Sequence, residues 1–216
     1  MARAAYRAAQ QALSAADPVM AALIERVGPC RLVVKRRASP YEALAHAVAH
    51  QQLHAAAANA MLKRLSMLGG DGENLPQAAQ LLAMGDQELR GCGFSRAKMA
   101  ALRDIAARTL DGTVPNRRAL QRLDDAAVIE RLTQLRGVGP WTVEMLLIFT
   151  LGRPDVLPAN DYGVRNGFRR AYGLTDLPTP RALAEHGQRW QPWRSIAAWY
   201  LWRAVELPAE QFGANS

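Results

Sequence analysis

The sequence predicts an all-α fold. Apolar residues recur at helical spacing along most of its 216 residues, and residues that begin or end helices punctuate these stretches. Only "CRLVVKR", at residues 30–36, has the character of a strand, and one short strand makes no sheet.

The helices are expected in an unbroken succession along the chain. Gly69 and Gly70 end one of them, and Asp86 and Ser95 are expected N-caps of two others. The expected helices span roughly 3–15, 18–27, 40–53, 55–68, 76–83, 86–91, 95–110, 116–122, 125–134, 140–152, 161–172, 180–189 and 192–205.

Composition excludes several classes of protein. Charged residues interrupt every apolar stretch well short of the roughly 18 residues that a membrane span needs, so no membrane partner is expected. The beginning, "MARAAYRAAQQALSAADP", lacks the continuous apolar region of a signal peptide and is expected to form the first helix. Cys30 and Cys92 are too few and too far apart for a disulfide framework, a zinc site or an iron–sulfur cluster, which suits a reducing cytosol.

The chain is strongly basic, with a formal net charge of +8 and a pI near 10.2. Such a charge favours a polyanionic partner, most simply nucleic acid. The alternative is a solvated basic face without a partner.

The stretch "LTQLRGVGPWTVEMLLIF", residues 132–149, sets a tight turn between two helical patterns. Gly137 and Gly139 permit positive φ and close approach of a partner, and Pro140 suits the first turn of the second helix. A phosphate can then sit against the backbone N–H groups of Gly137, Val138 and Gly139, a contact that reads the DNA backbone and no base sequence. The alternative is an ordinary turn between two helices.

Four motifs in this order resemble a known family. "LRGVGPWTVEMLL" followed by "DVLPANDYGVRNGF" resembles the helix-hairpin-helix and Gly/Pro…Asp signature of the helix-hairpin-helix (HhH-GPD) DNA glycosylase superfamily. "LAHAVAHQQLHAAAANAMLKRL" and "LRGCGFSRAKMAALRDIA" are similar to its early helix pair and its mid-domain helix turn. "RWQPWRSIAAWYLWR" is similar to the closing helix of the bacterial 3-methyladenine-DNA glycosylase II branch. Together the matches cover about residues 40–205.

The resemblance implies two helical lobes with a cleft between them that holds the active site. One lobe would comprise residues 40–152, including the helix-hairpin-helix, and the other residues 1–39 plus 153–216. The chain begins too close to the "QQ" helix for the extra N-terminal domain of the long form, so the resemblance is to the short form.

The family's catalytic aspartate falls on Asp161. Cleavage of an N-glycosidic bond builds positive charge on the sugar, and a nearby carboxylate stabilises that charge and can orient or deprotonate the attacking water. The alternative is that Asp161 only caps the helix that follows it.

Trp141 occupies the position at which strand-nicking branches of the family carry a lysine nucleophile. An indole forms no Schiff base, so the resemblance implies a monofunctional enzyme without AP-lyase activity. Trp141, with Trp202 and Met145, is expected in the base pocket, where aromatic rings attract cationic 3-methyladenine and 7-methylguanine. Core packing is the alternative for Trp202. The chain departs from the family at Asn160, where an acidic residue is frequent, and at Met145, where an aromatic is frequent.

The segment "HQQLH", residues 50–54, lies where the family enters DNA. Leu53 is the expected wedge in the gap left by the flipped base, and Gln51, Gln52 and His54 are expected DNA contacts. Packing in the helix core is the alternative for Leu53. His50 and His54 have metal-ligand spacing, but the sequence supplies no further ligands.

The resemblance implies no cofactor for catalysis. It does imply a structural sodium or potassium ion on the backbone carbonyls of Thr133, Leu135 and Val138. It further implies a monomer in a bacterial cytoplasm that excises alkylated bases from double-stranded DNA. Two other functions stay open: a non-catalytic helix-hairpin-helix DNA-binding module, and a glycosylase for mispaired or oxidised bases.

Overall fold

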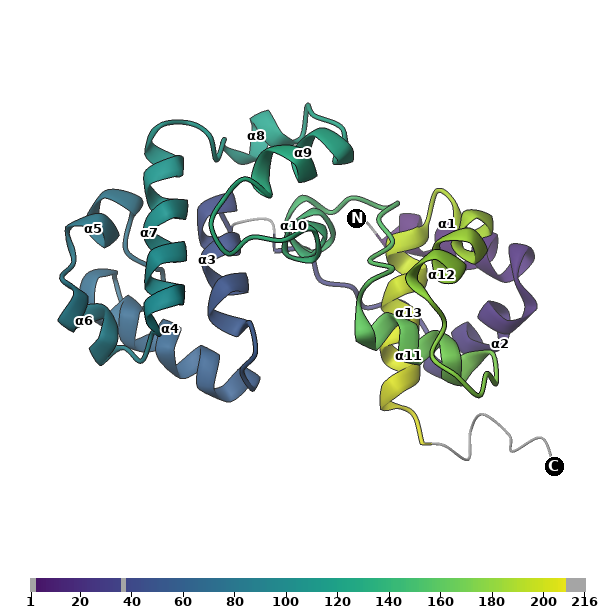
Figure 1. Ribbon diagram of the computed structural model, residues 1–216. Coiled ribbons are helices and arrows are strands. Elements are labelled where there is room, and N and C mark those ends of the chain that lie inside the picture. The colour runs from purple at the N-terminus through teal and green to yellow at the C-terminus, as the bar shows by residue number, and fades with distance from the viewer. Residues whose placement is uncertain (1–2, 36–37, 209–216) are drawn as a thin grey trace. The chain divides into compact units, whose positions relative to one another are not determined.

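The computed structural model describes residues 3–35 and 38–208, and within these ranges all regular secondary structure is helical (Figure 1). The chain divides into two compact units, a terminal unit (residues 1–34 and 152–216) and a central unit (residues 35–151). Lys35 thus groups with the central unit rather than with the N-terminal segment. The reason is local, since the Lys35 N–H donates to the Phe149 carbonyl at 2.7 Å. None of the described helices is long and apolar enough to cross a membrane.

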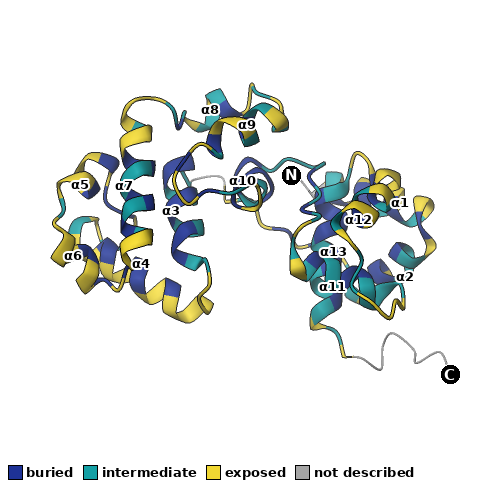
Figure 2. Cartoon of the chain, viewed as in Figure 1, coloured by how far each residue is buried: buried dark blue, intermediate teal, exposed yellow. Residues whose placement is uncertain are grey.

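The central unit is built around α7, Arg96–Leu110, which lies alongside α3 and α5 (Figure 1). Buried and exposed residues alternate along α7, whose inner face includes Leu102 and Ile105, both fully buried (Figure 2). Its other elements are α3 (Pro40–His50), α4 (Ala55–Gly69), α5 (Ala78–Ala83), α6 (Asp86–Gly91), α8 (Arg117–Leu120), α9 (Asp125–Leu132), α10 (Pro140–Leu146) and a π-helical turn, η1 (Leu147–Leu151).

The terminal unit joins the two ends of the chain. The N-terminal helices α1 (Arg3–Ala16) and α2 (Pro18–Val27) pack on α13 (Arg194–Glu206), which also packs on α11 (Tyr162–Ala171). The closest approach is at Gly167 of α11, where an added Cβ would lie 1.9 Å from the Leu201 carbonyl oxygen. Only glycine lets these two helices come so close. The unit also contains α12 (Pro180–His186) and a 3₁₀ turn, η2 (Gly187–Trp190).

A buried carboxylate, Asp17, ties the N-terminal helices to η2 and α12. Its Oδ1 caps α2 by accepting the Val19 and Met20 N–H groups, while Oδ2 accepts hydrogen bonds from Tyr172, His186 and Trp190. Burial opposes ionisation, but these hydrogen bonds outweigh it and hold the pKa of Asp17 below its usual value.

Two sequence predictions need correction. Residues 30–35, whose composition has the character of a strand, are irregular coil, in agreement with the predicted all-α fold; residue 36 lies outside the described residues. The expected helix 40–53 ends at His50, and residues 51–54 form a loop. Gly85, rather than Asp86, is the N-cap of α6; Asp86 lies in the first turn and pairs with Arg103 at 2.7 Å. Ser95 does cap α7, accepting the Lys98 N–H at 3.3 Å.

Candidate active site

The carboxylate of Asp161 stands at the N-terminus of α11. Its backbone is extended, with φ −67° and ψ 126°, and its Oδ1 accepts the Val164 N–H at 2.7 Å, the geometry of an N-cap. The side chain is half-buried. The positive end of the helix dipole therefore lies beside a carboxylate that solvent still reaches.

The same oxygen accepts a second hydrogen bond, from Trp202 of α13. The indole Nε1 lies 2.9 Å from Oδ1, so a residue 41 positions away in the chain orients the carboxylate. Trp202 is half-buried, so solvent still reaches part of the side chain that bonds Asp161. Core packing alone, the alternative drawn from the sequence, does not describe it.

Gly163 makes room for this pair. A Cβ at Gly163 would lie 3.0 Å from Trp202 Cδ1 and 3.1 Å from Asp161 Oδ1. Its conformation is not the constraint, because its φ lies outside the left-handed range; the lack of a side chain is what counts. Sequence reasoning missed this residue. Its signal was the spacing of Gly163 and Gly167, which places two small residues one turn apart on the face toward α13.

Trp141 and Met145 lie on α10 of the central unit, four residues apart and hence on one face. Trp141 is 39% exposed and Met145 half-buried, whereas Thr142, Val143 and Leu146 are buried. The side chains of Trp141 and Met145 thus lie on the accessible face of α10, and the opposite face packs in the core of the central unit.

The expected hairpin connects α9 to α10. Gly137 is left-handed, with φ +74°, while Gly139 has φ −97°, and an added Cβ there would meet nothing within 4 Å. Buried Leu135 and Val138 anchor the turn. The Val138 N–H donates to the Leu135 carbonyl at 3.1 Å, so this amide, one of the three expected to face phosphate, is engaged within the turn.

The four residues of the loop 51–54 that the sequence predicts to contact DNA differ in orientation. Gln51 turns inward, and its Nε2 donates to the Gly137 carbonyl at 2.9 Å. Gln52 is left-handed at φ +56°, Leu53 is 42% exposed and His54 is exposed, so these three face outward. Leu53 is therefore not a core residue.

His50 does not pair with His54 as a metal ligand. Its Nδ1 lies 2.8 Å from the His46 carbonyl and its Nε2 lies 3.0 Å from Asn59 Oδ1. Within residues 3–35 and 38–208 there is also no cluster of three or more His, Cys, Asp or Glu side chains that would hold a metal.

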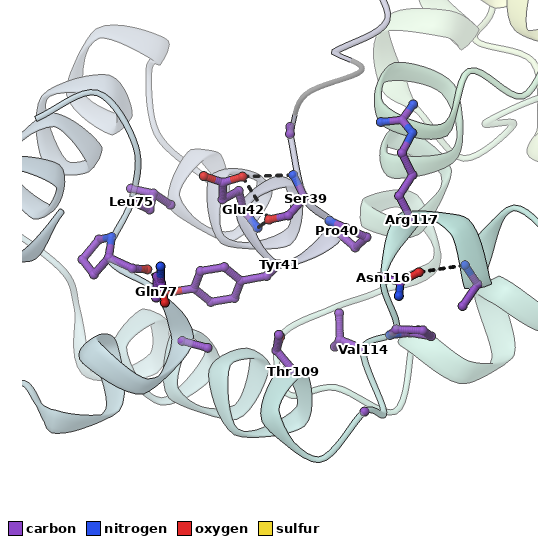
Figure 3. Close-up of a pocket in the computed structure, with 16 residues that line it drawn as sticks. Ser39, Pro40, Tyr41, Glu42, Leu75, Gln77, Thr109, Val114, Asn116 and Arg117 are labelled. Carbon is purple, nitrogen blue, oxygen red and sulfur yellow. Dashed lines mark hydrogen bonds between the residues drawn. The ribbon is translucent and has the colours of Figure 1, made fainter. Parts of the chain in front are cut away.

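A pocket of about 800 Å³ lies elsewhere in the central unit, beside the N-terminus of α3 (Figure 3). None of the sequence-predicted site residues lines it. Its polar side chains serve the helices: Glu42 accepts from Ser39, Asn116 caps α8, and Arg117 donates to the Lys35 and Thr150 carbonyls. These partners explain the polar lining without a ligand.

Comparison with known proteins identifies relatives over most of the chain. DNA-3-methyladenine glycosylase 1 of Schizosaccharomyces pombe is 42% identical over 198 residues, which cover 90% of this chain and 86% of that protein. The alkylbase DNA glycosidase-like protein mag2 of the same yeast is 32% identical, covering 94% and 95%.

Two solved structures share the fold over nearly all of the chain. The S. pombe 3-methyladenine DNA glycosylase in complex with abasic DNA matches with a TM-score of 0.84 at 41% identity, covering 93% of this chain and 98% of that one. A DNA-3-methyladenine glycosidase from Bacillus halodurans matches with a TM-score of 0.82 at 32% identity, covering 93% and 90%. The model of the HhH-GPD superfamily matches residues 45–192. The chain therefore belongs to the HhH-GPD superfamily of base excision DNA repair proteins.

Proposed function

We propose that the protein is a monofunctional DNA glycosylase that excises alkylated bases, 3-methyladenine and 7-methylguanine among them, from double-stranded DNA. One observation supports the chemistry above all: in a chain of this family, Asp161 is oriented by the Val164 and Trp202 N–H groups. The names of its relatives support the substrate class.

The proposed reaction is hydrolysis of the bond between C1′ of the sugar and the base nitrogen. The base is turned out of the duplex, and the bond breaks with its electron pair leaving on the base. The Asp161 carboxylate stabilises the positive charge that develops on the sugar. Water then forms a bond to C1′ and loses a proton, leaving an abasic site. A methylated, cationic base leaves as a neutral molecule, so this substrate class demands no general acid.

We infer that the enzyme has no AP-lyase activity because position 141 carries no amine. Trp141 stands where the lyases of the family carry lysine. The Lys98 ammonium donates to the Ala49 and Gln51 carbonyls at 2.6 and 2.9 Å, and the Lys63 ammonium donates to the Gly72 carbonyl. Two of the three lysines are thus engaged with backbone carbonyls of the central unit, and the third, Lys35, is exposed at the start of that unit.

The remaining roles follow the family resemblance. Trp141, Trp202 and Met145 would contact the base, Leu53 would fill the gap that it leaves, and Gln52 and His54 would contact the neighbouring DNA. Gly137 and Gly139 would let a phosphate approach the hairpin backbone. We further propose that the protein acts as a monomer in a bacterial cytoplasm.

A sodium or potassium ion on the carbonyls of Thr133, Leu135 and Val138 is compatible with the turn. The Leu135 oxygen accepts one hydrogen bond, from the Val138 N–H, and a carbonyl oxygen has two lone pairs. When bound, the ion would supply positive charge beside the phosphate.

A panel of duplex oligonucleotides tests this function, each with one defined lesion, incubated with and without subsequent alkali. We expect release of 3-methyladenine and 7-methylguanine, strand breaks only after alkali, and no borohydride-trapped protein–DNA complex. Binding without release of any base would establish the non-catalytic module. Release confined to mispaired or oxidised bases would reject alkylation repair, and a trapped complex would reject the monofunctional assignment.

A further inference from the structure

One face of α7 contacts both loops that the proposed function directs toward DNA. Lys98, Ala101 and Asp104 are spaced by three residues and thus form one row on the helix. Lys98 contacts the end of α3 and the first residue of the loop 51–54, whereas Ala101 and Asp104 contact the hairpin.

Lys98 closes the C-terminal end of α3. Its ammonium donates to the Ala49 carbonyl at 2.6 Å and to the Gln51 carbonyl at 2.9 Å, which α3 leaves without helical partners as it ends. Burial lowers the pKa of Lys98 from its usual value. The second of these bonds fixes the peptide unit that leads directly into Gln52.

The Lys98–Gln51 hydrogen bond restrains the backbone next to Gln52, whose conformation is unusual. Its φ of +56° is left-handed, which costs a residue with a side chain about 1 kcal/mol or more. Such strain persists only where the surroundings determine the backbone. Lys98 on one side and the Leu53 N–H bond to the His50 carbonyl on the other provide that restraint.

Ala101 and Asp104, in the same row of α7 as Lys98, contact the hairpin. Asp104 Oδ2 accepts the Arg136 N–H at 2.8 Å, and an added Cβ on Gly137 would lie 3.0 Å from the Ala101 Cβ. Gln51 then links the two loops, because its side chain donates to the Gly137 carbonyl.

We propose that α7 is a common brace for the two DNA-facing loops, and that Lys98 is the positioning residue that keeps Gln52 and Leu53 in the conformation that enters DNA. What the loops do rests on the proposed function; how they are held does not. Lys98 accordingly acts through the loop and touches neither the base nor the sugar.

Hydrogen–deuterium exchange tests the brace without reference to catalysis. In Lys98→Met we expect faster amide exchange in residues 51–54, with a smaller increase in residues 136–139 transmitted through Gln51. Asp104→Ala should speed exchange mainly in residues 136–139. The matched control is Lys63→Met, which also removes a lysine–carbonyl bond of the central unit but should leave both loops unchanged. Unchanged exchange at residues 51–54 in Lys98→Met would overturn the proposal.

Single-turnover excision separates positioning from general damage to the fold. We expect Lys98→Met to slow excision of 7-methylguanine paired with cytosine about tenfold, the loss expected for one charge-assisted hydrogen bond. The loss should be smaller for the same lesion in a mismatch, where turning the base out costs less. Lys98→Arg, which keeps donors at this place, should recover most of the rate. Equal losses in both contexts would contradict the positioning role.

A second variant and the exchange measurement distinguish failure of the brace from misfolding and from failure of the proposed function. If Lys98→Met does not fold, Lys98→Gln removes the charge with a smaller change and is judged by the same criteria. If the wild-type protein releases no base at all, the proposed function fails, while the exchange measurement still decides whether α7 braces the loops.

Discussion

Asp161 serves two purposes through one atom, because its Oδ1 caps α11 and also accepts the Trp202 indole N–H. From the sequence the two interpretations, helix cap and catalytic carboxylate, compete. In the structure they are compatible, since capping is what holds the carboxylate in one orientation. The two interpretations then differ only in what removal of the charge does.

Asp161→Asn removes the charge and preserves the cap, because asparagine caps helices as well as aspartate does. We expect unchanged thermal stability and DNA affinity, and a loss of single-turnover excision on the order of hundredfold, as for other groups that stabilise developing charge. Asp124→Asn is the matched control, since Asp124 caps α9 through the Ala127 N–H. A near wild-type rate in Asp161→Asn would show that the residue is only a cap.

A second residue-scale prediction asks whether Trp141 favours charged over neutral bases. If its exposed ring stacks on a cationic base, the attraction amounts to about 2 kcal/mol in a desolvated pocket, more than tenfold in rate. Trp141→Ala should therefore slow excision of 7-methylguanine and 3-methyladenine more than that of hypoxanthine, which is neutral. Trp141→Phe should recover part of the difference. Equal losses on all three bases would leave Trp141 as a wall of the pocket without a role in charge recognition.

At the scale of elements, the hairpin depends on two glycines for different reasons. Gly137 needs its left-handed φ and lies against Ala101, so any side chain there strains the turn. Gly139 has an ordinary φ and open space, so an alanine fits the unbound protein. The sequence pattern alone does not show that Gly137 and Gly139 are needed for different reasons.

Gly139→Ala consequently tests close approach of DNA without damage to the fold. We expect unchanged thermal stability and weaker binding to damaged and undamaged duplexes alike, because phosphate contacts carry no sequence information. Gly137→Ala should lower both stability and affinity. Gly91→Ala, at another uncrowded glycine, is the control for affinity and should leave DNA binding unchanged. A loss confined to one lesion would instead place the hairpin in the base pocket.

At the scale of the whole molecule, the terminal unit depends on contacts between the two ends of the chain. Asp17 accepts from His186, 169 residues away, and from Trp190, and it is almost completely buried. Loss of this carboxylate leaves several buried donors without an acceptor.

Asp17→Asn should lower the free energy of unfolding by about 2 kcal/mol at neutral pH, the cost of leaving buried donors unsatisfied. The pKa of Asp17 is lowered by folding, so its contribution is complete above the unfolded pKa of about 3.9 and is lost as pH falls through the lower folded pKa. The difference between wild type and variant in urea titrations should thus shrink below about pH 4. Asp176→Asn, an exposed site in the same unit, is the control. A difference independent of pH would show that the Asp17 charge contributes nothing.

The sequence by itself determined the all-helical fold, most helix limits, the hairpin turn and the aspartate at the head of α11. These depend on local rules: apolar spacing, caps such as Ser95, and glycine at a turn. Its errors were also local, since α3 ends at His50, before Leu53, and α6 is capped by Gly85 rather than by Asp86.

Only the tertiary structure decided which side chains meet. Trp202 reaches Asp161 across 41 residues and Lys98 reaches Ala49 across 49, and both pairs depend on how helices cross rather than on any spacing in the chain. Gly163 matters for the same reason. The Trp202 ring of α13 fills the space that a side chain at position 163 would need. A motif identifies the residue that we propose acts in catalysis, whereas the packing of distant helices fixes the atoms that orient it.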